Sequence, residues 1–340
     1  MKMKKFFALL MAGIMTAGML AGCGGSEDQA AQASDPAPDT KLSFIVSYKD
    51  EYLGMLDMAV KAAAESKGCE LTSTGCADDM DKQLQYVRAA ASNGTDAILV
   101  VLADDMRADE VVEAAGDTKI VFINRIPQDE SVLDENHIYV GSDESCSGTY
   151  QGEMLAGELK KEGKDNINYV MIEGTAGLIH TIQRSEDVLK VLDEEGITAT
   201  AAVEPVDCGY DRITAMDQMT VMLAEGLDMS KVDCVIANND AMALGALESL
   251  RQNGIDTSDI LVVGIDGTNA GLTAVSDGTM LATVYQNATG QAIAGVQAAI
   301  NLATGAELTE GMSYETDEEN SNIIWVLFEK VTADNVAEYL

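Results

Sequence analysis

Histidine, tryptophan and positive charge are scarce in this 340-residue sequence. The only two histidines are His137 and His180, which excludes a histidine-rich metal site. Lysine and arginine together number 21 against 57 acidic residues, so the formal charge is -36 at pH 7. Because so acidic a chain repels phosphate backbones and no basic patch is present, we exclude nucleic acid as a partner.

Cysteine is also sparse, and its pattern argues against a disulfide framework. Apart from Cys23, five cysteines are scattered along the chain: Cys69, Cys76, Cys146, Cys208 and Cys234. The first two flank the predicted strand 70–74, which rises by roughly 3.3 Å per residue. That spacing holds them beyond the ~7 Å limit for a disulfide. We therefore expect all five to be free, buried apolar side chains.

Signatures of common enzymes are missing. The sequence contains no G-x-S-x-G, G-x-x-x-x-G-K-[ST] or H-E-x-x-H motif. Residues 173–177 read E-G-T-A-G and lack the glycine spacing of a dinucleotide-binding loop. We predict no enzyme and no cofactor, although a glycosidase with a dispersed carboxylate pair stays open as an alternative.

The N-terminus has the pattern of an export signal. Three lysines precede the uncharged apolar run 6–20, which is shorter than the roughly 20 residues of a membrane span. The run ends in Leu-Ala-Gly-Cys at 20–23, which resembles a bacterial lipoprotein signal. The resemblance implies cleavage of residues 1–22 and a diacylglyceryl group on Cys23; ordinary secretion is the alternative. Residues 23–40 are small and polar and are expected to form a lipidated, flexible tether.

The remaining chain alternates strand-like and helix-like segments. Predicted strands are 42–47, 70–74, 97–102, 119–123 and 138–140, with helices 52–67, 79–92 and 108–115 between them. The same alternation restarts after residue 143. This pattern predicts an α/β fold with two doubly wound parallel-sheet lobes joined by hinge strands. We place residues 41–143 plus 287–304 in the first lobe and 144–286 plus 321–340 in the second.

Polar residues follow the predicted strands. Amides, carboxylates and arginines follow the ends of six predicted strands, at Asp50, Asn124 with Arg125, 174–184, 238–240, Asp266 and Gln286. In doubly wound sheets, ligands bind beyond the carboxyl ends of the strands. Asn, Asp and Gly are also ordinary turn and N-cap residues, so both interpretations stand at each single position.

Three segments carry a family resemblance. Cys-Val-Ile-Ala-Asn-Asn-Asp-Ala-Met-Ala-Leu-Gly-Ala at 234–246, Val-Gly-Ile-Asp-Gly at 263–267 and Ala-Thr-Val-Tyr-Gln at 282–286 resemble the type I periplasmic sugar-binding proteins. The galactose/glucose and ribose types are most similar. The resemblance implies a monomer whose lobes close on a monosaccharide and which then docks on an ABC permease.

The resemblance also assigns contact residues. The sugar-binding set carried over to this sequence is Asp50, Tyr52, Asn124, Arg125, His180, Arg184, Tyr210, Asn239, Asp266 and Gln286. Amides both donate to and accept from sugar hydroxyls, carboxylates accept, and a guanidinium donates in a planar fork. The tyrosine rings are expected to cover the C–H faces of the sugar.

Purely structural roles remain open for several of these residues. Asp50 and Asn239 are also suited to be helix N-caps, Asp266 to be a turn residue, and Tyr210 to be a core-packed loop aromatic. Arg184 is also compatible with a surface helix charge.

Some positions depart from the galactose type. Leu178 and His180 stand where that type has a histidine and an acid, and Gln286 matches the ribose type. These differences favour a pentose-like or unassigned sugar. Residues 162–167 do not match the calcium loop of the galactose type, so we predict no metal.

The sequence therefore predicts an extracytoplasmic binding lipoprotein, anchored to the membrane by the lipid on Cys23, that delivers a monosaccharide to an ABC importer. A sugar receptor for chemotaxis or two-component signalling is the alternative, and a glycosidase ranks third.

Overall fold

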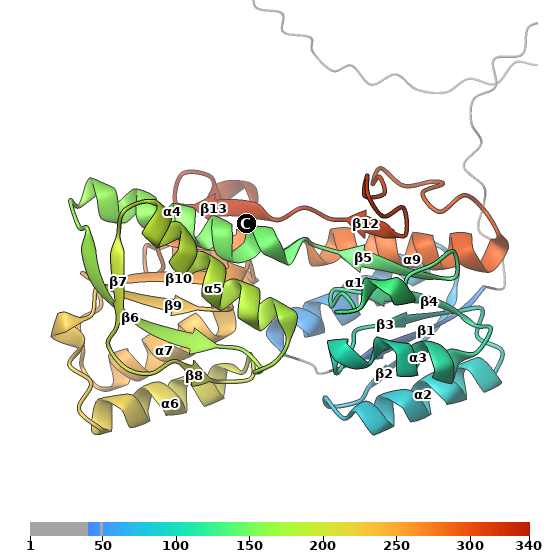
Figure 1. Ribbon diagram of the computed structural model, residues 1–340, viewed down its shortest axis with the longest axis horizontal. Coiled ribbons are helices and arrows are strands. Elements are labelled where there is room, and N and C mark those ends of the chain that lie inside the picture. Colours follow the sequence, from blue (N-terminus) through green and yellow to red (C-terminus); the bar gives the residue numbers. More distant parts are fainter. Residues whose placement is uncertain (1–39, 48–49) are drawn as a thin grey trace, which may run out of the picture. The chain divides into compact units, whose positions relative to one another are not determined.

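The computed structural model describes residues 40–47 and 50–340. The predicted signal, Cys23 and nearly all of the tether lie outside the described residues. Within the described residues, two sheets form two lobes, which Figure 1 shows on the left and the right. This arrangement confirms the predicted fold class of two doubly wound, mainly parallel α/β lobes.

The first sheet has six parallel strands in the order β12-β5-β4-β3-β1-β2. Their bounds are β1 (Lys41–Val46), β2 (Glu70–Gly75), β3 (Ala97–Val100), β4 (Lys119–Ile123), β5 (His137–Gly141) and β12 (Ile323–Trp325). Helices α1 (Glu51–Ser66) and α9 (Ala288–Thr304) pack on one face. Helices α2 (Met80–Ser92) and α3 (Ala108–Ala115) pack on the other. Apolar residues on both faces of the strands explain the near-continuous hydrophobic runs in the sequence.

The second sheet has the order β13-β11-β10-β9-β6-β7, with β8 paired to β6. The bounds are β6 (Asn166–Glu173), β7 (Thr198–Ala201), β8 (Val206–Asp207), β9 (Cys234–Ala237), β10 (Leu261–Asp266), β11 (Ala282–Tyr285) and β13 (Glu329–Thr332). Only β13 runs antiparallel to its neighbour. Helices α4 (Ser147–Lys161) and α5 (Ile179–Glu194) cover one face. Helices α6 (Arg212–Ala224), α7 (Asp240–Gln252) and α8 (Asn269–Ser276) cover the other.

Five short 3-10 helices complete the described elements. They are η1 (Asp105–Arg107), η2 (Glu130–Val132), η3 (Glu144–Cys146), η4 (Met229–Lys231) and η5 (Val336–Glu338). Two of them are important for the site, because η1 follows β3 in the first lobe and η3 opens the second lobe.

The chain crosses between the lobes three times: after β5, after β11 and after β12 (Figure 1). The first and third crossings are bonded to each other. The backbone N–H of Val326 donates to the carbonyl of Gly141 at 2.7 Å, and Ser142 Oγ donates to the carbonyl of Val326 at 2.6 Å. Side-chain and backbone bonds therefore fix the two crossing segments side by side.

One predicted boundary is wrong. We assigned the whole run from Ser321 to the second lobe, but β12 pairs in parallel with β5 at the edge of the first sheet. Ile323 and Ile324 are buried there, since the edge of β5 offers both backbone partners and an apolar surface. Only β13, beyond the crossing, belongs to the second sheet.

The cysteines partly follow the prediction. All five in the described residues are free, and Cys76, Cys208 and Cys234 are buried. The expectation of complete burial is wrong for Cys69 and Cys146, which are partly exposed. Cys69 directly precedes an edge strand, β2, and edge positions have fewer neighbours to cover them.

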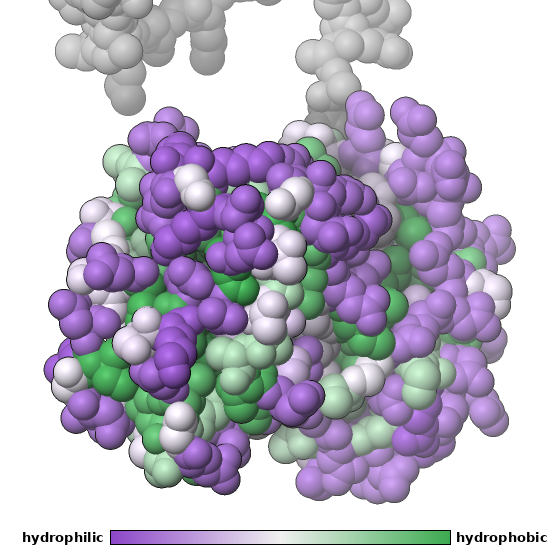
Figure 2. Space-filling model, turned by 60° about the vertical axis from the view of Figure 1, so that its left-hand side comes forward, coloured by the Kyte–Doolittle hydropathy of each residue, from purple (hydrophilic) through white to green (hydrophobic). Residues whose placement is uncertain are grey.

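Hydrophilic side chains dominate the face on which the second lobe comes forward (Figure 2). Figure 2 turns the second lobe forward and shows purple, hydrophilic residues over most of the face, with green hydrophobic areas between them. Among the described residues, no helix is both long enough and apolar enough to span a bilayer.

Candidate functional site

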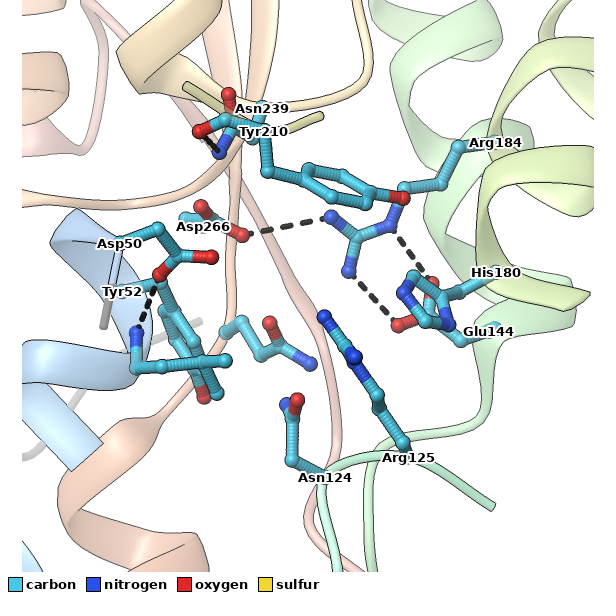
Figure 3. Close-up of a pocket in the computed structure, with 12 residues that line it drawn as sticks. Asp50, Tyr52, Asn124, Arg125, Glu144, His180, Arg184, Tyr210, Asn239 and Asp266 are labelled. Carbon is cyan, nitrogen blue, oxygen red and sulfur yellow. Dashed lines mark hydrogen bonds and ion pairs between the residues drawn. The ribbon is translucent and has the colours of Figure 1, made fainter. Parts of the chain in front are cut away.

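One cavity between the two lobes collects every predicted contact residue. Twelve side chains line it and surround about 330 Å³ of space, part of it open to solvent. Ten are the predicted set, and Leu53 and Glu144 are additional (Figure 3). The first lobe provides Asp50, Tyr52, Leu53, Asn124 and Arg125; the second provides Glu144, His180, Arg184, Tyr210, Asn239, Asp266 and Gln286.

Arg184, on α5, is the most extensively bonded side chain of the cavity. Its Nε donates to Glu144 Oε2 at 2.9 Å, and its Nη2 donates to Glu144 Oε1 at 2.7 Å. Its Nη1 donates to the carbonyl of Asn238 at 3.0 Å and to Asp266 Oδ1 at 3.4 Å. Arg184 is only 4% exposed, so the alternative of a surface helix charge is wrong.

The charges around Arg184 depend on one another. Burial alone lowers the pKa of Arg184, but the facing Glu144 carboxylate more than compensates and raises that pKa above its ordinary value. Burial raises the pKa of Asp266 well above its usual range, although Arg184 opposes the shift. Arg184 therefore remains charged, and Asp266 holds a proton more readily than an exposed aspartate.

Tyr210 and His180 form an aromatic wall. Their ring centroids lie 5.5 Å apart with the planes inclined by 28°. Gly174 makes room for the tyrosine, because a Cβ at that position would lie 2.0 Å from Tyr210 Cζ. The Tyr210 hydroxyl bonds to Thr181 Oγ1 at 2.7 Å, and the residue both packs in the core and lines the cavity.

His180 is uncharged in this setting. Burial lowers its pKa well below the ordinary value, and the nearby charges of Arg125 and Arg184 lower it further. Its imidazole is therefore neutral at pH 7 and offers one donor and one acceptor.

Asp50 and Asn239 are helix caps as well as cavity residues. Asp50 Oδ1 accepts from Leu53 N at 2.7 Å at the start of α1. Asn239 Oδ1 accepts from Met242 N at 2.9 Å at the start of α7. Asp50 and Asn239 are therefore each both a helix N-cap and a lining residue of the cavity. Burial raises the pKa of Asp50 to about 6.

The first-lobe side of the cavity is tied to the crossing segments. Asn124 has φ +70° and its Nδ2 donates to Gln291 Oε1 at 3.4 Å. Gln291 Nε2 in turn donates to Ser142 Oγ at 3.1 Å, in the first crossing segment. The neighbouring Arg125 donates to the carbonyl of Leu102 at 2.9 Å. Movement at the crossings is therefore coupled to the position of Asn124.

Two buried polar atoms of the cavity residues lack a partner in the described structure. They are Tyr52 Oη and Gln286 Nε2. Tyr52 is 4% exposed and Gln286 is 1% exposed, so bulk water does not supply the missing bonds. An unpaired buried donor costs on the order of 1–3 kcal/mol. Such groups are expected where a polar ligand completes the network.

Contacts also join the lobes outside the cavity. The Asp105 carboxylate of η1, in the first lobe, accepts from Ile179 N at 2.9 Å, the first residue of α5 in the second lobe. The residue preceding α5 provides no side-chain cap, so Asp105 supplies the N-cap from the opposite lobe. Gln128 supports this contact, because its Nε2 donates to Asp105 Oδ1 at 2.9 Å and to the carbonyl of Gly177 at 3.4 Å.

Sequence reasoning missed Glu144 and Leu53. Glu144 does not follow a strand end; it opens η3 directly after the first crossing segment. The available signal was its position beside the crossover at 140–143. Leu53 carries no polar group that marks a site. Among the described residues, no group of three His, Cys, Asp or Glu side chains is placed to hold a metal ion.

The comparisons agree with this geometry. Residues 43–307 match the model of the periplasmic binding protein domain. The chain belongs to the periplasmic binding protein domain family. The match covers more than half of the chain and includes all three motif segments, so the predicted resemblance is confirmed.

Three individual periplasmic-binding-protein relatives illustrate the match. The D-galactose/methyl-galactoside binding periplasmic protein of Haemophilus influenzae is 28% identical over 318 residues, covering 89% of this chain and 93% of that protein. A D-ribose/D-allose-binding protein of Pseudomonas aeruginosa is 31% identical over 242 residues, covering 69% and 72%. The crystal structure of an ABC transporter solute binding protein from Bacillus halodurans with bound myo-inositol is 28% identical, covers 91% of this chain and 99% of that chain, and has a TM-score of 0.75. All three are binding proteins.

We predict that Asp105→Ala opens the lobes of the unliganded protein. Loss of an N-cap costs about 1 kcal/mol, which shifts the equilibrium between open and closed forms about fivefold. Small-angle X-ray scattering should show a larger radius of gyration for the variant. Asp109→Ala, which removes an exposed acid of α3, is the control and should match wild type. An unchanged radius for Asp105→Ala contradicts the role of this contact.

Proposed function

We propose that this protein captures a monosaccharide or a similar ring polyol between its lobes and delivers it to an ABC importer. One observation carries the proposal: the unpartnered Tyr52 Oη and Gln286 Nε2 occur in the same cavity as the carboxylates of Asp50 and Asp266. A ring of hydroxyls, each a donor and an acceptor, satisfies such a mixture.

The shape and chemistry of the cavity support a single small ring. Side chains of both lobes enclose it from opposite sides, which suits a small molecule rather than a polymer segment. The Tyr210 ring, stacked on His180, offers an apolar face to C–H groups. The relatives named above bind, by their names and titles, galactose, ribose, allose or myo-inositol. Hexoses, pentoses and cyclitols therefore belong in the first ligand screen.

Closure of the lobes is the proposed way in which binding is signalled to the importer. Residues of both lobes line the cavity, so a ligand held by both favours the closed form. Asp105 and Gln128 add contacts that form only when the lobes meet. Each lobe carries part of the proposed sugar-binding set, and closure brings the two parts to the same ligand.

The proposed function is tested by a thermal-shift screen of the mature chain against pentoses, hexoses and cyclitols, followed by calorimetry. A true ligand raises the midpoint, because it binds only the folded state. Arg184→Ala and Asp266→Ala should each weaken binding by about 100-fold, since each leaves buried charges unpaired. Arg251→Ala, which removes an exposed arginine of α7 outside the cavity, should bind normally. No shift with any sugar or cyclitol, or normal binding by both cavity variants, contradicts the proposal.

Binding should also depend on pH through Asp50. Its pKa is about 6, so the carboxylate that accepts a ligand hydroxyl is lost as the pH falls through that value. We expect constant affinity above pH 7 and about tenfold weaker binding at pH 5. The folded-state pKa lies above the ordinary 3.8, so this group makes the unliganded fold less stable as pH rises between those values.

Asp50→Asn provides the control for this pH dependence. The variant should bind more weakly at pH 7.5, with most of the decline between pH 7 and 5 removed. A full decline in Asp50→Asn assigns the effect to another group and contradicts the role of Asp50. Isothermal calorimetry at matched ionic strength makes the measurement.

We further propose that a diacylglyceryl group on Cys23 anchors the protein outside the cytoplasm. Two acyl chains contribute about 0.8 kcal/mol per buried methylene, enough for stable attachment. In cell fractionation, wild type should be found with membranes and should incorporate labelled fatty acid. Cys23→Ser should lose both properties. A soluble, unlabelled wild type contradicts the anchor.

A further inference from the structure

The charged groups of the cavity leave no excess of positive charge. Three carboxyl groups line it, from Asp50, Glu144 and Asp266, against two guanidinium groups, from Arg125 and Arg184. His180 adds no charge, because its pKa lies well below the ordinary value. Even if Asp266 is protonated, the two negative charges of Asp50 and Glu144 balance the two positive charges of the arginines. An anionic ligand would therefore enter a cavity that offers it no net attraction.

Arg184 has no free pair of parallel donors for an anion. The Nε and Nη2 edge, which normally grips a carboxylate, is occupied by Glu144 at 2.9 Å and 2.7 Å. Nη1 donates to the Asn238 carbonyl and to Asp266, so a single N–H on Nη2 remains. Figure 3 shows the Arg184 guanidinium between the carboxyl groups of Glu144 and Asp266. Glu144 itself is held in place by Ser147, whose Oγ donates to Oε2 at 2.8 Å.

Arg125 also lies beside an acid. Its Nη1 donates to the Leu102 carbonyl and lies 3.6 Å from Asp78 Oδ1. Its charge also acts on the carboxyls of Asp50 and Asp105, lowering their pKa values against the effect of burial. The charge of Arg125 is therefore shared among several acids of the first lobe before any ligand arrives.

We propose that the cavity selects an uncharged sugar or cyclitol against its anionic counterparts, and that Glu144 is the residue that sets this selectivity. The inference rests on the proposed function, because it concerns the ligand of the same site. Glu144 neutralises Arg184 and occupies its carboxylate-binding edge. A sugar acid or sugar phosphate therefore meets three acids and finds the carboxylate-binding edge of Arg184 already occupied.

The selectivity is tested with pairs of ligands that differ in charge and little in size. D-galacturonamide and D-galacturonate form the first pair, and D-gluconamide and D-gluconate the second. Calorimetry on wild type should show at least about 100-fold preference for the uncharged member, because like charges brought together in an interface cost several kcal/mol. The pair used is the one whose uncharged member binds wild type.

Substitutions at Glu144 then separate charge from shape. Glu144→Gln removes the negative charge at nearly constant size and frees Arg184, so the preference for the uncharged member should fall at least tenfold through gained affinity for the anion. Glu144→Asp keeps the charge and should keep the preference. Glu225→Gln, which removes an exposed acid at the end of α6, is the matched control and should behave as wild type.

The outcomes distinguish this inference from the proposed function. If no parent sugar, cyclitol or amide binds wild type, the proposed function itself fails. If parent sugars bind but neither amide does, size rather than charge decides and the inference is overturned. A wild-type preference below tenfold overturns it whether or not Glu144→Gln folds. An unchanged preference in a folded Glu144→Gln overturns the role of Glu144.

Discussion

The buried guanidinium of Arg184 is the constraint on which the site depends. Removing a charge from water costs several kcal/mol unless its partners are well placed. Here the partners are the Glu144 carboxylate, Asp266 and the carbonyl of Asn238. They come from the start of η3 and from the ends of β9 and β10. Satisfying one arginine thus fixes three separate parts of the second lobe around a common point.

This arrangement builds the second-lobe half of the cavity without help from the first lobe. The first-lobe half is fixed differently, by helix caps and by the bonds from Asn124 through Gln291 to the crossing segment. Asp50 uses one carboxylate oxygen to begin α1, which leaves the other to face the cavity. The side chains of each half are therefore already held in place before the lobes close. Because few side chains have to be ordered on closure, the entropy cost of binding is limited.

Much of the fold and site was predictable because the signals were local. Alternating strand and helix patterns predicted the two lobes. Polar residues after strands predicted most of the ten cavity residues, and the family resemblance added Tyr52 and Tyr210. The converging ends of parallel strands explain why such residues gather. At Asn239 the two interpretations did not exclude each other, since its Oδ1 caps α7 while the residue lines the cavity.

The missed features depend on contacts between distant segments. Glu144 has no motif of its own, and its role appears only when Arg184 lies beside it, 40 residues later. Asp105 caps a helix 74 residues away in the other lobe, and no local pattern reveals such a partner. The β12 error has the same origin: a three-residue strand joins whichever sheet edge it reaches, and here that edge is β5.

A crystal structure of the protein with a sugar or cyclitol selected by binding tests the account most directly. We predict one uncharged ring between the lobes, with hydroxyls within hydrogen-bond distance of Asp50, Gln286 and Asp266, and the Arg184–Glu144 pair intact. A ligand bound outside this cavity, or one whose anionic group displaces Glu144 from Arg184, would contradict it.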